Sequence, residues 1–289
     1  MRITVSHETT YTYEVAPASV IELLRLTPRS TANQTVRSWR IDVTGDATLR
    51  RAEDAFGNIV HTFYAHDPGE RLRVTAVGTV DTEPTSGVAA GAPEPQPLGV
   101  WRRQTPLTKA DASLVALAGA ARASVGEAAL DRAHALNRLV HERIAYERGS
   151  TTAATPATAA LAAGRGVCQD LTHVLIAAAR ADGLPARYVS GYQYVEGQPR
   201  THHESHAWAE VHVDGLGWVS LDPTFGASAT DAYVRVAVGL DTLSASPVRG
   251  ATYGGAGEAL SVAVTVDRAV SQSRQVQDGR SQSQSQSQG

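Results

Sequence analysis

The sequence predicts an α+β protein in which a β-rich N-terminal domain is followed by helices and then by a second group of strands. Three observations carry this prediction. Apolar and polar residues alternate at period two in parts of the first 82 residues. After residue 108 the apolar residues recur every three to four positions, as on one face of a helix. Period-two segments and a hairpin turn return after Pro185.

Composition limits the class of protein. The chain has 289 residues, 42% hydrophobic and 19% charged, which is enough to bury a sizeable core. Its formal net charge of −3 provides no basic surface for nucleic acid or an anionic membrane. With one cysteine, Cys168, an intrachain disulfide and a multi-cysteine zinc site are excluded. The sequence has no apolar run of membrane-spanning length and no secretory signal pattern, so we expect a cytoplasmic protein.

Residues 1–82 are expected to form the N-terminal β domain. The alternation is clearest at residues 3–13, and looser at residues 36–43 and 72–80. Between residues 49–51 and residues 59–63, residues 54–58 (Asp-Ala-Phe-Gly-Asn) are typical of a turn. Residues 83–107 contain five prolines and several glycines, which indicates a linker.

Residues 108–268 are expected to form the core of the protein. Its first helical stripe consists of Leu136, Leu139, Val140 and Ile144. Thr155 and Pro156 are suited to begin a second helix, which Gly164 is suited to end. A third helix should begin at Cys168 and stop at residues 183–185 (Gly-Leu-Pro).

The strands of this core are expected after the third helix. Residues 187–192 form one, and residues 205–213 and 218–221 form a pair joined by a hairpin turn. Further strands are expected near residues 234–238 and 260–266. The remaining residues, 269–289, repeat Ser-Gln and are expected to be a disordered tail.

Cys168 is the first candidate for chemistry. It follows Gly164 and Gly166 and begins an amphipathic helix. At a helix N-terminus the macrodipole and the unpaired backbone N–H groups favour a thiolate, the nucleophilic form of cysteine. The Cys168 N–H would also point to where an oxyanion develops. A lone cysteine is more often a small buried core residue, so the assignment depends on its partners.

Two partners are expected on the strand pair. In residues 205–213, His206, Trp208, Glu210 and His212 point to one face, and the intervening alanines and valines to the other. A symmetric hairpin places Asp222 near His206 on the neighbouring strand. There its carboxylate would accept from one imidazole nitrogen and leave the other to face a nucleophile. Cys168, His206 and Asp222 thus have the residue types of a thiol triad.

These segments resemble the bacterial transglutaminase-like family. The resemblance lies in residues 166–170 (Gly-Val-Cys-Gln-Asp), 183–192, 205–211 (Ser-His-Ala-Trp-Ala-Glu-Val) and 217–224 (Gly-Trp-Val-Ser-Leu-Asp-Pro-Thr). It implies a papain-like transglutaminase core, with helices packed on an antiparallel sheet or barrel, and carries the catalytic triad over to Cys168, His206 and Asp222. Residues 1–82 resemble the N-terminal β domain that accompanies this core in bacteria.

The family resemblance implies cysteine-dependent acyl transfer on protein or peptide amides, such as glutamine, through a thioester and without a cofactor. A primary amine or water could resolve the thioester, so a transferase and a peptidase or amidase both stay open. An inactive protein-binding module of the same fold is the alternative from another class.

Candidate substrate contacts are the aromatic residues Trp208, Tyr192 and Trp218, for which core packing is an equal alternative. Residues 202–206 (His-His-Glu-Ser-His) are rich in histidine, but a solvated loop is favoured over a metal site. No metal is therefore expected.

Overall fold

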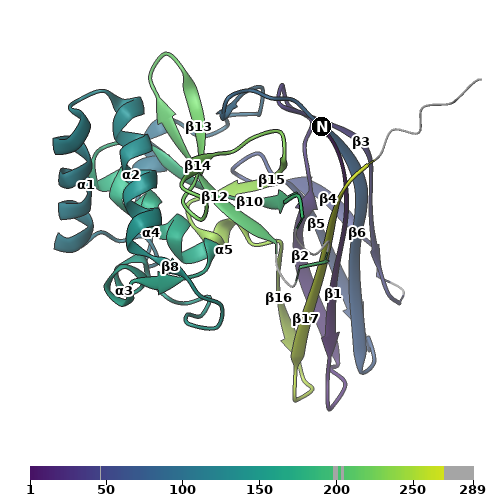
Figure 1. Ribbon diagram of the computed structural model, residues 1–289. Helices are drawn as coiled ribbons and strands as arrows, with labels where there is room; N and C mark the ends of the chain where they lie inside the picture. Colours follow the sequence, from purple (N-terminus) through teal and green to yellow (C-terminus); the bar gives the residue numbers. More distant parts are fainter. Residues whose placement is uncertain (46, 198–200, 203–204, 270–289) are drawn as a thin grey trace, which may run out of the picture.

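The computed structural model describes residues 1–45, 47–197, 201–202 and 205–269. It consists of a β domain and an α+β core that lie side by side (Figure 1). The predicted fold class is confirmed. The predicted tail, residues 270–289, lies outside the described residues. Among the described residues, the helices are all too short or too polar to cross a membrane.

The β domain is a pair of sheets. Its first 82 residues supply β1 Arg2–Thr12, β2 Ser19–Thr27, β3 Gln34–Val43, β4 Arg50–Glu53, β5 Ile59–His66 and β6 Arg71–Thr82. The period-two pattern of β1 buries Ile3, Val5, His7, Thr9 and Tyr11 on one face. Apolar side chains from both sheets, among them those of β1, β2, β5 and β6, form one buried cluster between them. Strand β2 is a strand that the sequence did not predict.

Two strands from the end of the described chain complete the β domain. β16 Val248–Tyr253 pairs with β2, and β17 Ala259–Arg268 pairs with β1 along its whole length. The sheet orders are β11-β17-β1-β6-β3, where β11 is Thr201–His202, and β16-β2-β5-β4. The prediction that residues 108–268 all belong to the core is therefore wrong. These strands join the N-terminal sheets through backbone pairing between the two ends of the chain, which local sequence patterns do not reveal.

The expected linker is ordered and packed. β7 Val88–Ala89 pairs with the core strand β13, and the 3₁₀ helix Leu98–Arg102 buries the side chain of Trp101 completely. Its prolines restrict the backbone conformation of this segment, and these two contacts hold it against the core.

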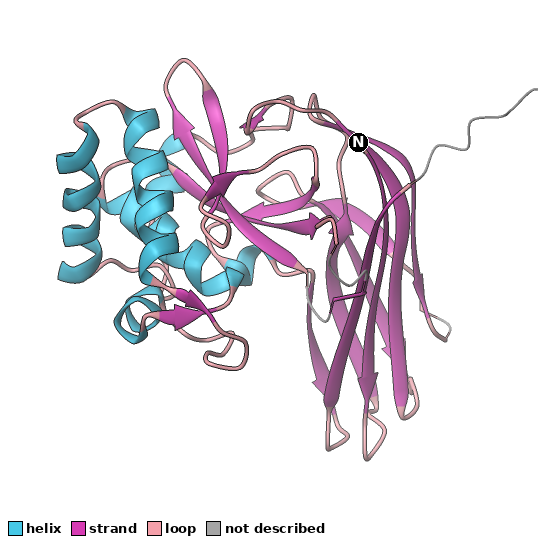
Figure 2. Cartoon of the chain, in the orientation of Figure 1, coloured by secondary structure: helices cyan, strands magenta, loops and turns pink. Residues whose placement is uncertain are grey.

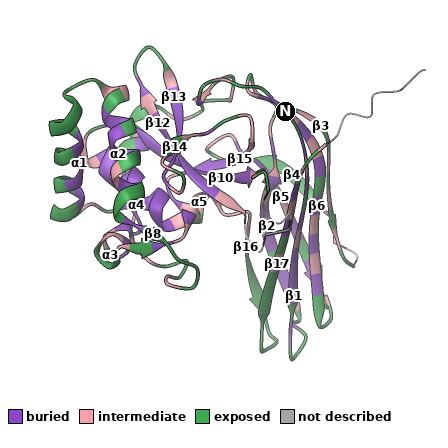
Figure 3. Cartoon of the chain, viewed as in Figure 1, coloured by how far each residue is buried: buried purple, intermediate pink, exposed green. Residues whose placement is uncertain are grey.

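The core begins with helices. They are α1 Ala112–Val125, α2 Ala129–Arg143, α3 Ala157–Ala163 and α4 Cys168–Ala181, with a short α5 Thr242–Ala245 further along the chain. Asp111 caps α1 through the N–H groups of Ser113 and Leu114. Gly164 ends α3 in the left-handed conformation, with φ +62°, as glycine permits. Helix α4 is buried over nearly its whole length (Figure 3).

The helices pack on one face of an antiparallel sheet (Figure 2). Its strands are β10 Ala186–Gln193, β12 His206–Val213, β13 Gly217–Asp222, β14 Ala227–Ser228 and β15 Tyr233–Gly239, in the order β14-β13-β12-β10-β15. A separate parallel pair joins β8 Ala145–Tyr146 to β9 Arg165–Gly166. The alanines and valines of β12 pack against the helices, and Trp208 lies on the opposite face of the strand. The two predicted faces of this strand are therefore confirmed.

Two amide side chains of the β domain fasten it to β15. Gln34 donates to the carbonyl of Arg235 at 2.7 Å and accepts from its N–H at 2.9 Å. Asn58 does the same with Val238, at 2.7 and 2.8 Å. Each side chain thus pairs with backbone as a neighbouring strand would, which satisfies buried polar groups and fixes the two domains relative to each other.

Candidate active site

Cys168 is the first residue of α4, where the sequence places it. Its side chain is 7% exposed and contacts two hollows that open beside it. In the first turn of a helix the backbone N–H groups have no preceding helical carbonyl as partner. The thiol therefore lies at the positive end of the α4 dipole, where it lines both hollows.

Asp170 shapes the turn before this helix. Its Oδ2 accepts from the backbone N–H of Val167 at 2.8 Å and from the hydroxyl of Thr151 at 2.6 Å. A Cβ at Gly166 would lie 2.7 Å from the Cβ of Asp170, closer than real contacts allow. Glycine at 166 thus lets Asp170 cap α4. This carboxylate acts on the conformation of the Cys168 loop, not on the reacting atoms.

His206 and Asp222 meet across the β12–β13 hairpin. The register pairs Ala209 with Leu221, so Asp222 falls opposite residue 208, one pleat from His206. His206 Nε2 lies 2.6 Å from Asp222 Oδ2. The other oxygen, Oδ1, accepts from the N–H of Thr224 at 2.8 Å, which fixes the carboxylate plane.

Electrostatics couple His206 to both neighbours. Burial opposes its protonation, but the charge of Asp222 and the hydrogen bond to it, with a smaller contribution from Cys168, raise the pKa of His206 to about 10. Nε2 is engaged by Asp222, so Nδ1 is the nitrogen left for the sulfur. The structure therefore brings the three residues of the predicted triad together in the order thiol, imidazole and carboxylate.

Tyr233 is a fourth member that the sequence did not indicate. Its hydroxyl donates to Asp222 Oδ2 at 2.8 Å and accepts from Gln193 Nε2 at 2.6 Å. Its ring contacts that of His206, with centroids 6.0 Å apart. Burial and the neighbouring Asp222 carboxylate raise the pKa of Tyr233, so it remains a phenol and a donor. Tyr233 thus orients the carboxylate that orients the imidazole.

Tyr188 is a second residue that sequence reasoning missed. It lies on β10, and burial together with the nearby Cys168 raises the pKa of its phenol. Tyr188 lines the same hollow as Cys168 and Thr242, and its side chain forms a hydrogen bond with that of Thr242. Its pattern in the sequence is that of an ordinary β residue, so no local signal marks it.

Two hollows meet at the sulfur, each of about 310 Å³. Both are lined by Cys168, Ser205 and His206. The walls of one, the apolar hollow, include the side chains of Tyr11, Leu243, Pro247, Val248, Leu260 and Val262, together with uncharged polar side chains such as those of Thr9, Gln169 and Ser246. The other, the second hollow, is bounded by Tyr146, Arg148, Gln193, Phe225, Val264 and Val266, among others. The β domain therefore forms part of the wall of both.

The predicted substrate contacts divide. Tyr192 lines the second hollow, although its hydroxyl is engaged by His7 Nδ1 at 3.0 Å. Trp218 is buried beneath the guanidinium of Arg187, 3.8 Å from its ring centroid, and lines neither hollow. The prediction for Trp218 is corrected, because this indole supports a buried charge in the core.

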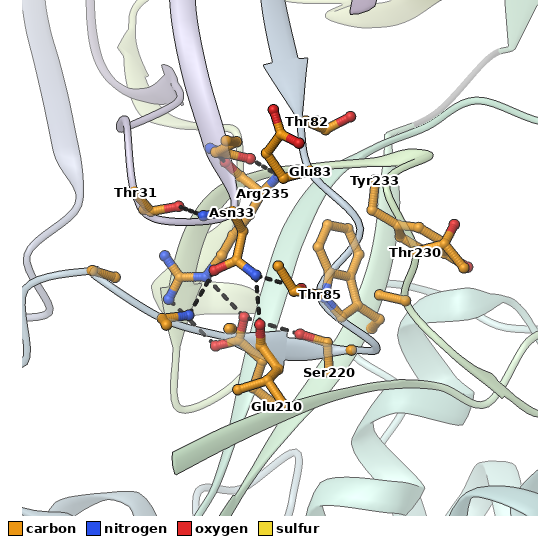
Figure 4. Close-up of a pocket in the computed structure, with 18 residues that line it drawn as sticks. Thr31, Asn33, Thr82, Glu83, Thr85, Glu210, Ser220, Thr230, Tyr233 and Arg235 are labelled. Carbon is orange, nitrogen blue, oxygen red and sulfur yellow. Dashed lines mark hydrogen bonds and ion pairs between the residues drawn. The ribbon is translucent and has the colours of Figure 1, made fainter. Parts of the chain in front are cut away.

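Trp208 also faces away from the sulfur, and its prediction is corrected as well. It lines a small polar cavity of about 50 Å³ at the domain junction, shown in Figure 4. Glu210, Ser220, Tyr233 and Arg235 of the core meet threonines and Asn33 of the β domain there. Tyr233 borders this cavity and also contacts Asp222, so it links the domain junction to the site.

Within the histidine-rich segment, His203 and Glu204 lie outside the described residues. In the parts of the chain that the structure describes, no cluster of three or more histidine, cysteine or carboxylate side chains is arranged to hold a metal ion.

Comparison with known families agrees with this geometry. Residues 117–223 match the transglutaminase-like superfamily, and residues 3–81 match the bacterial transglutaminase-like N-terminal region. An uncharacterized protein of Mycobacterium leprae is 30% identical over 284 residues, which is 92% of this chain and 99% of that protein.

Two further similarities are more limited. A protein-glutamine gamma-glutamyltransferase of Pseudomonas aeruginosa is 34% identical over 103 residues, 31% of this chain and 15% of that protein. A crystal structure from Cytophaga hutchinsonii, of a protein proposed to be a cysteine protease, superposes with a TM-score of 0.71 at 18% identity. It covers 92% of this chain and 90% of its own, and shows a shared fold.

Proposed function

Because the chain belongs to the transglutaminase-like superfamily, we propose that it is a cysteine acyltransferase that acts on protein or peptide amides through a thioester. The observation that carries the proposal is the arrangement at the site. The Cys168 thiol, at a helix N-terminus and lining both hollows, interacts with an imidazole that lies 2.6 Å from a buried carboxylate. Cysteine acyl transfer needs these groups in this order.

The first half of the reaction follows from the positions of the groups. The Cys168 sulfur attacks the amide carbon, and the carbonyl oxygen becomes an oxyanion beside the N–H of Cys168. The imidazolium of His206 gives its proton to the departing nitrogen, the C–N bond breaks, and a thioester forms with release of ammonia or an amine. Asp222 keeps the ring in place and stabilises its charged form.

The second half regenerates the enzyme. A primary amine attacks the thioester carbon, His206 accepts its proton, and the C–S bond breaks to return the thiolate. The similarity to a protein-glutamine gamma-glutamyltransferase and the partly enclosed sulfur support an amine as the acceptor. Water in its place would give an amidase or peptidase with the same acyl-enzyme.

Incubating the protein with a glutamine-containing peptide library and a labelled primary amine separates these outcomes. We expect amine to be incorporated into peptides at neutral pH, with release of ammonia and with activity lost in Cys168→Ala. Parallel reactions without the amine measure hydrolysis. Shortened or deamidated peptides without amine incorporation would show that the enzyme is a hydrolase and not a transferase. Incorporation that persists in Cys168→Ala would refute the assigned nucleophile.

A further inference from the structure

The apolar hollow lies against the nucleophile and continues the interface between the domains. On β17, Val264 and Val266 pack against the core, and further along the same face Val262 and Leu260 line the hollow. Leu260 pairs with Tyr11 of β1 across the sheet, so both side chains lie on the face turned to the core. One part of this apolar sheet face thus packs on the core, and the next part forms a wall of the hollow beside Cys168.

Two large apolar side chains in this hollow are exposed to solvent. Leu260 on β17 is 57% exposed, and Leu243 on α5, which also lines the hollow, is 46% exposed. Exposed leucines that converge beside a nucleophile lose their contact with water when a ligand covers them, which is favourable. The volume of about 310 Å³ has room for one large side chain together with the peptide that carries it.

The described residues of the lining offer polar groups but no charged side chain that is free to pair with a ligand. Among the described residues that bound the hollow, Asp, Glu, Lys and Arg are all missing. Its histidines are committed: His7 is buried between Tyr192 and Thr9, and His206 is held by Asp222. A charged side chain entering here would lose hydration without gaining an ion pair of its own, because the charge of His206 is already paired with Asp222.

From these observations we infer that the apolar hollow is a specificity subsite for a large apolar side chain of the acyl-donor peptide, close to the amide that is attacked. This inference rests on the proposed function. It assigns a role to the β domain, because β1, β16 and β17 supply much of the wall. Selection then comes from the completed sheet, and the chemistry from the core.

The test uses glutamine peptides that differ only in the residues flanking glutamine, with leucine, phenylalanine, alanine or aspartate on either side. We expect kcat/KM for the best apolar peptide to exceed that for its aspartate counterpart by about 10–100-fold, the range that apolar pockets reach. Leu260→Asp should reduce this ratio at least tenfold.

Ser261→Asp is the matched control, because Ser261 is the exposed neighbour on the opposite face of β17. It should keep the preference. Leu243→Asp, from the opposite wall, should repeat the Leu260→Asp result and covers the case in which that variant does not fold.

A wild-type enzyme that turns over apolar and acidic peptides equally, with activity lost in Cys168→Ala, would overturn the subsite and leave the proposed function standing. No turnover of any peptide by folded protein would refute both. Equal loss of preference in Ser261→Asp and Leu260→Asp would also contradict the inference, since only one of these side chains lines the hollow.

Discussion

Asp222→Asn should lower kcat/KM for amide substrates by about 10⁴-fold, the cost typical of replacing the orienting carboxylate of a triad. The asparagine fits the same space, and its carbonyl oxygen can still accept from Thr224 N–H. It no longer stabilises the imidazolium of His206, and its amide nitrogen presents the wrong partner to Nε2. Steady-state kinetics measure the loss, and circular dichroism checks the fold.

The pH profile of the same variant gives a second readout. In the wild type the pKa of His206 is raised to about 10, so the imidazolium that protonates the leaving group persists through neutral pH. Activity should therefore fall as pH rises through about 10. Without the carboxylate the basic limb should move down toward the ordinary histidine value, about 6.5.

Tyr233→Phe is the graded comparison for this prediction. It removes one of the hydrogen bonds to Asp222 but keeps the charge, so we expect a loss of about tenfold and a smaller downward shift of the basic limb. An Asp222→Asn enzyme with wild-type kinetics, or an unmoved basic limb, would show that the carboxylate does not act on His206.

Glu210→Gln should cost about 3–5 kcal/mol in the free energy of unfolding, the usual cost of breaking a buried ion pair. Glu210 is fully buried and accepts from Arg187 Nε at 2.6 Å and from Arg235 Nε at 2.8 Å. Arg187 is itself only 1% exposed. The variant leaves two cations without their shared anion. Urea unfolding measures the loss.

The difference in the free energy of unfolding between the wild type and Glu210→Gln should depend on pH. Burial opposes ionisation, but the charges of Arg235 and Arg187 lower the pKa of Glu210 to about 2. A lowered carboxylate pKa contributes stability that is present above the unfolded value, near 4.5, and is lost as pH falls toward 2. The difference in the free energy of unfolding between wild type and variant should therefore become smaller as the pH falls below 4.5.

Glu142→Gln is the control for Glu210. It breaks an exposed pair with Arg138, separated by 4.0 Å on the surface of α2, which is worth about 0.3–0.5 kcal/mol. If Glu210→Gln destabilised the protein no more than this control, the buried network would not be a main source of stability.

Local signals were sufficient for the parts of the site that depend on neighbours in sequence. Pro156, Gly164 and the residues after 182 limit the helices, so the sequence places Cys168 at the start of α4. A short turn joins β12 to β13, so the register that brings Asp222 to His206 follows from symmetry.

Long-range pairings were not available from such patterns. Tyr233 begins β15 and Asp222 ends β13, and the two meet although β10 and β12 lie between their strands in the sheet. β17 pairs with β1 at the other end of the chain, which is why the C-terminal strands were assigned to the core. Trp208 and Trp218 are of the residue type that often lines a cleft. Their face of the sheet also carries the buried ion pair of Arg187 and Glu210 and lies in the interior of the protein.

The central claim is that His206 activates Cys168, and alkylation tests it without any assumed substrate. Cys168 is the one cysteine of the chain, so each labelled thiol is this residue. The rate of iodoacetamide labelling at pH 6, followed by intact mass, should be high in the wild type and at least tenfold lower in His206→Ala, as expected when a thiolate loses its imidazolium partner. Equal rates in the two proteins would contradict this role of His206.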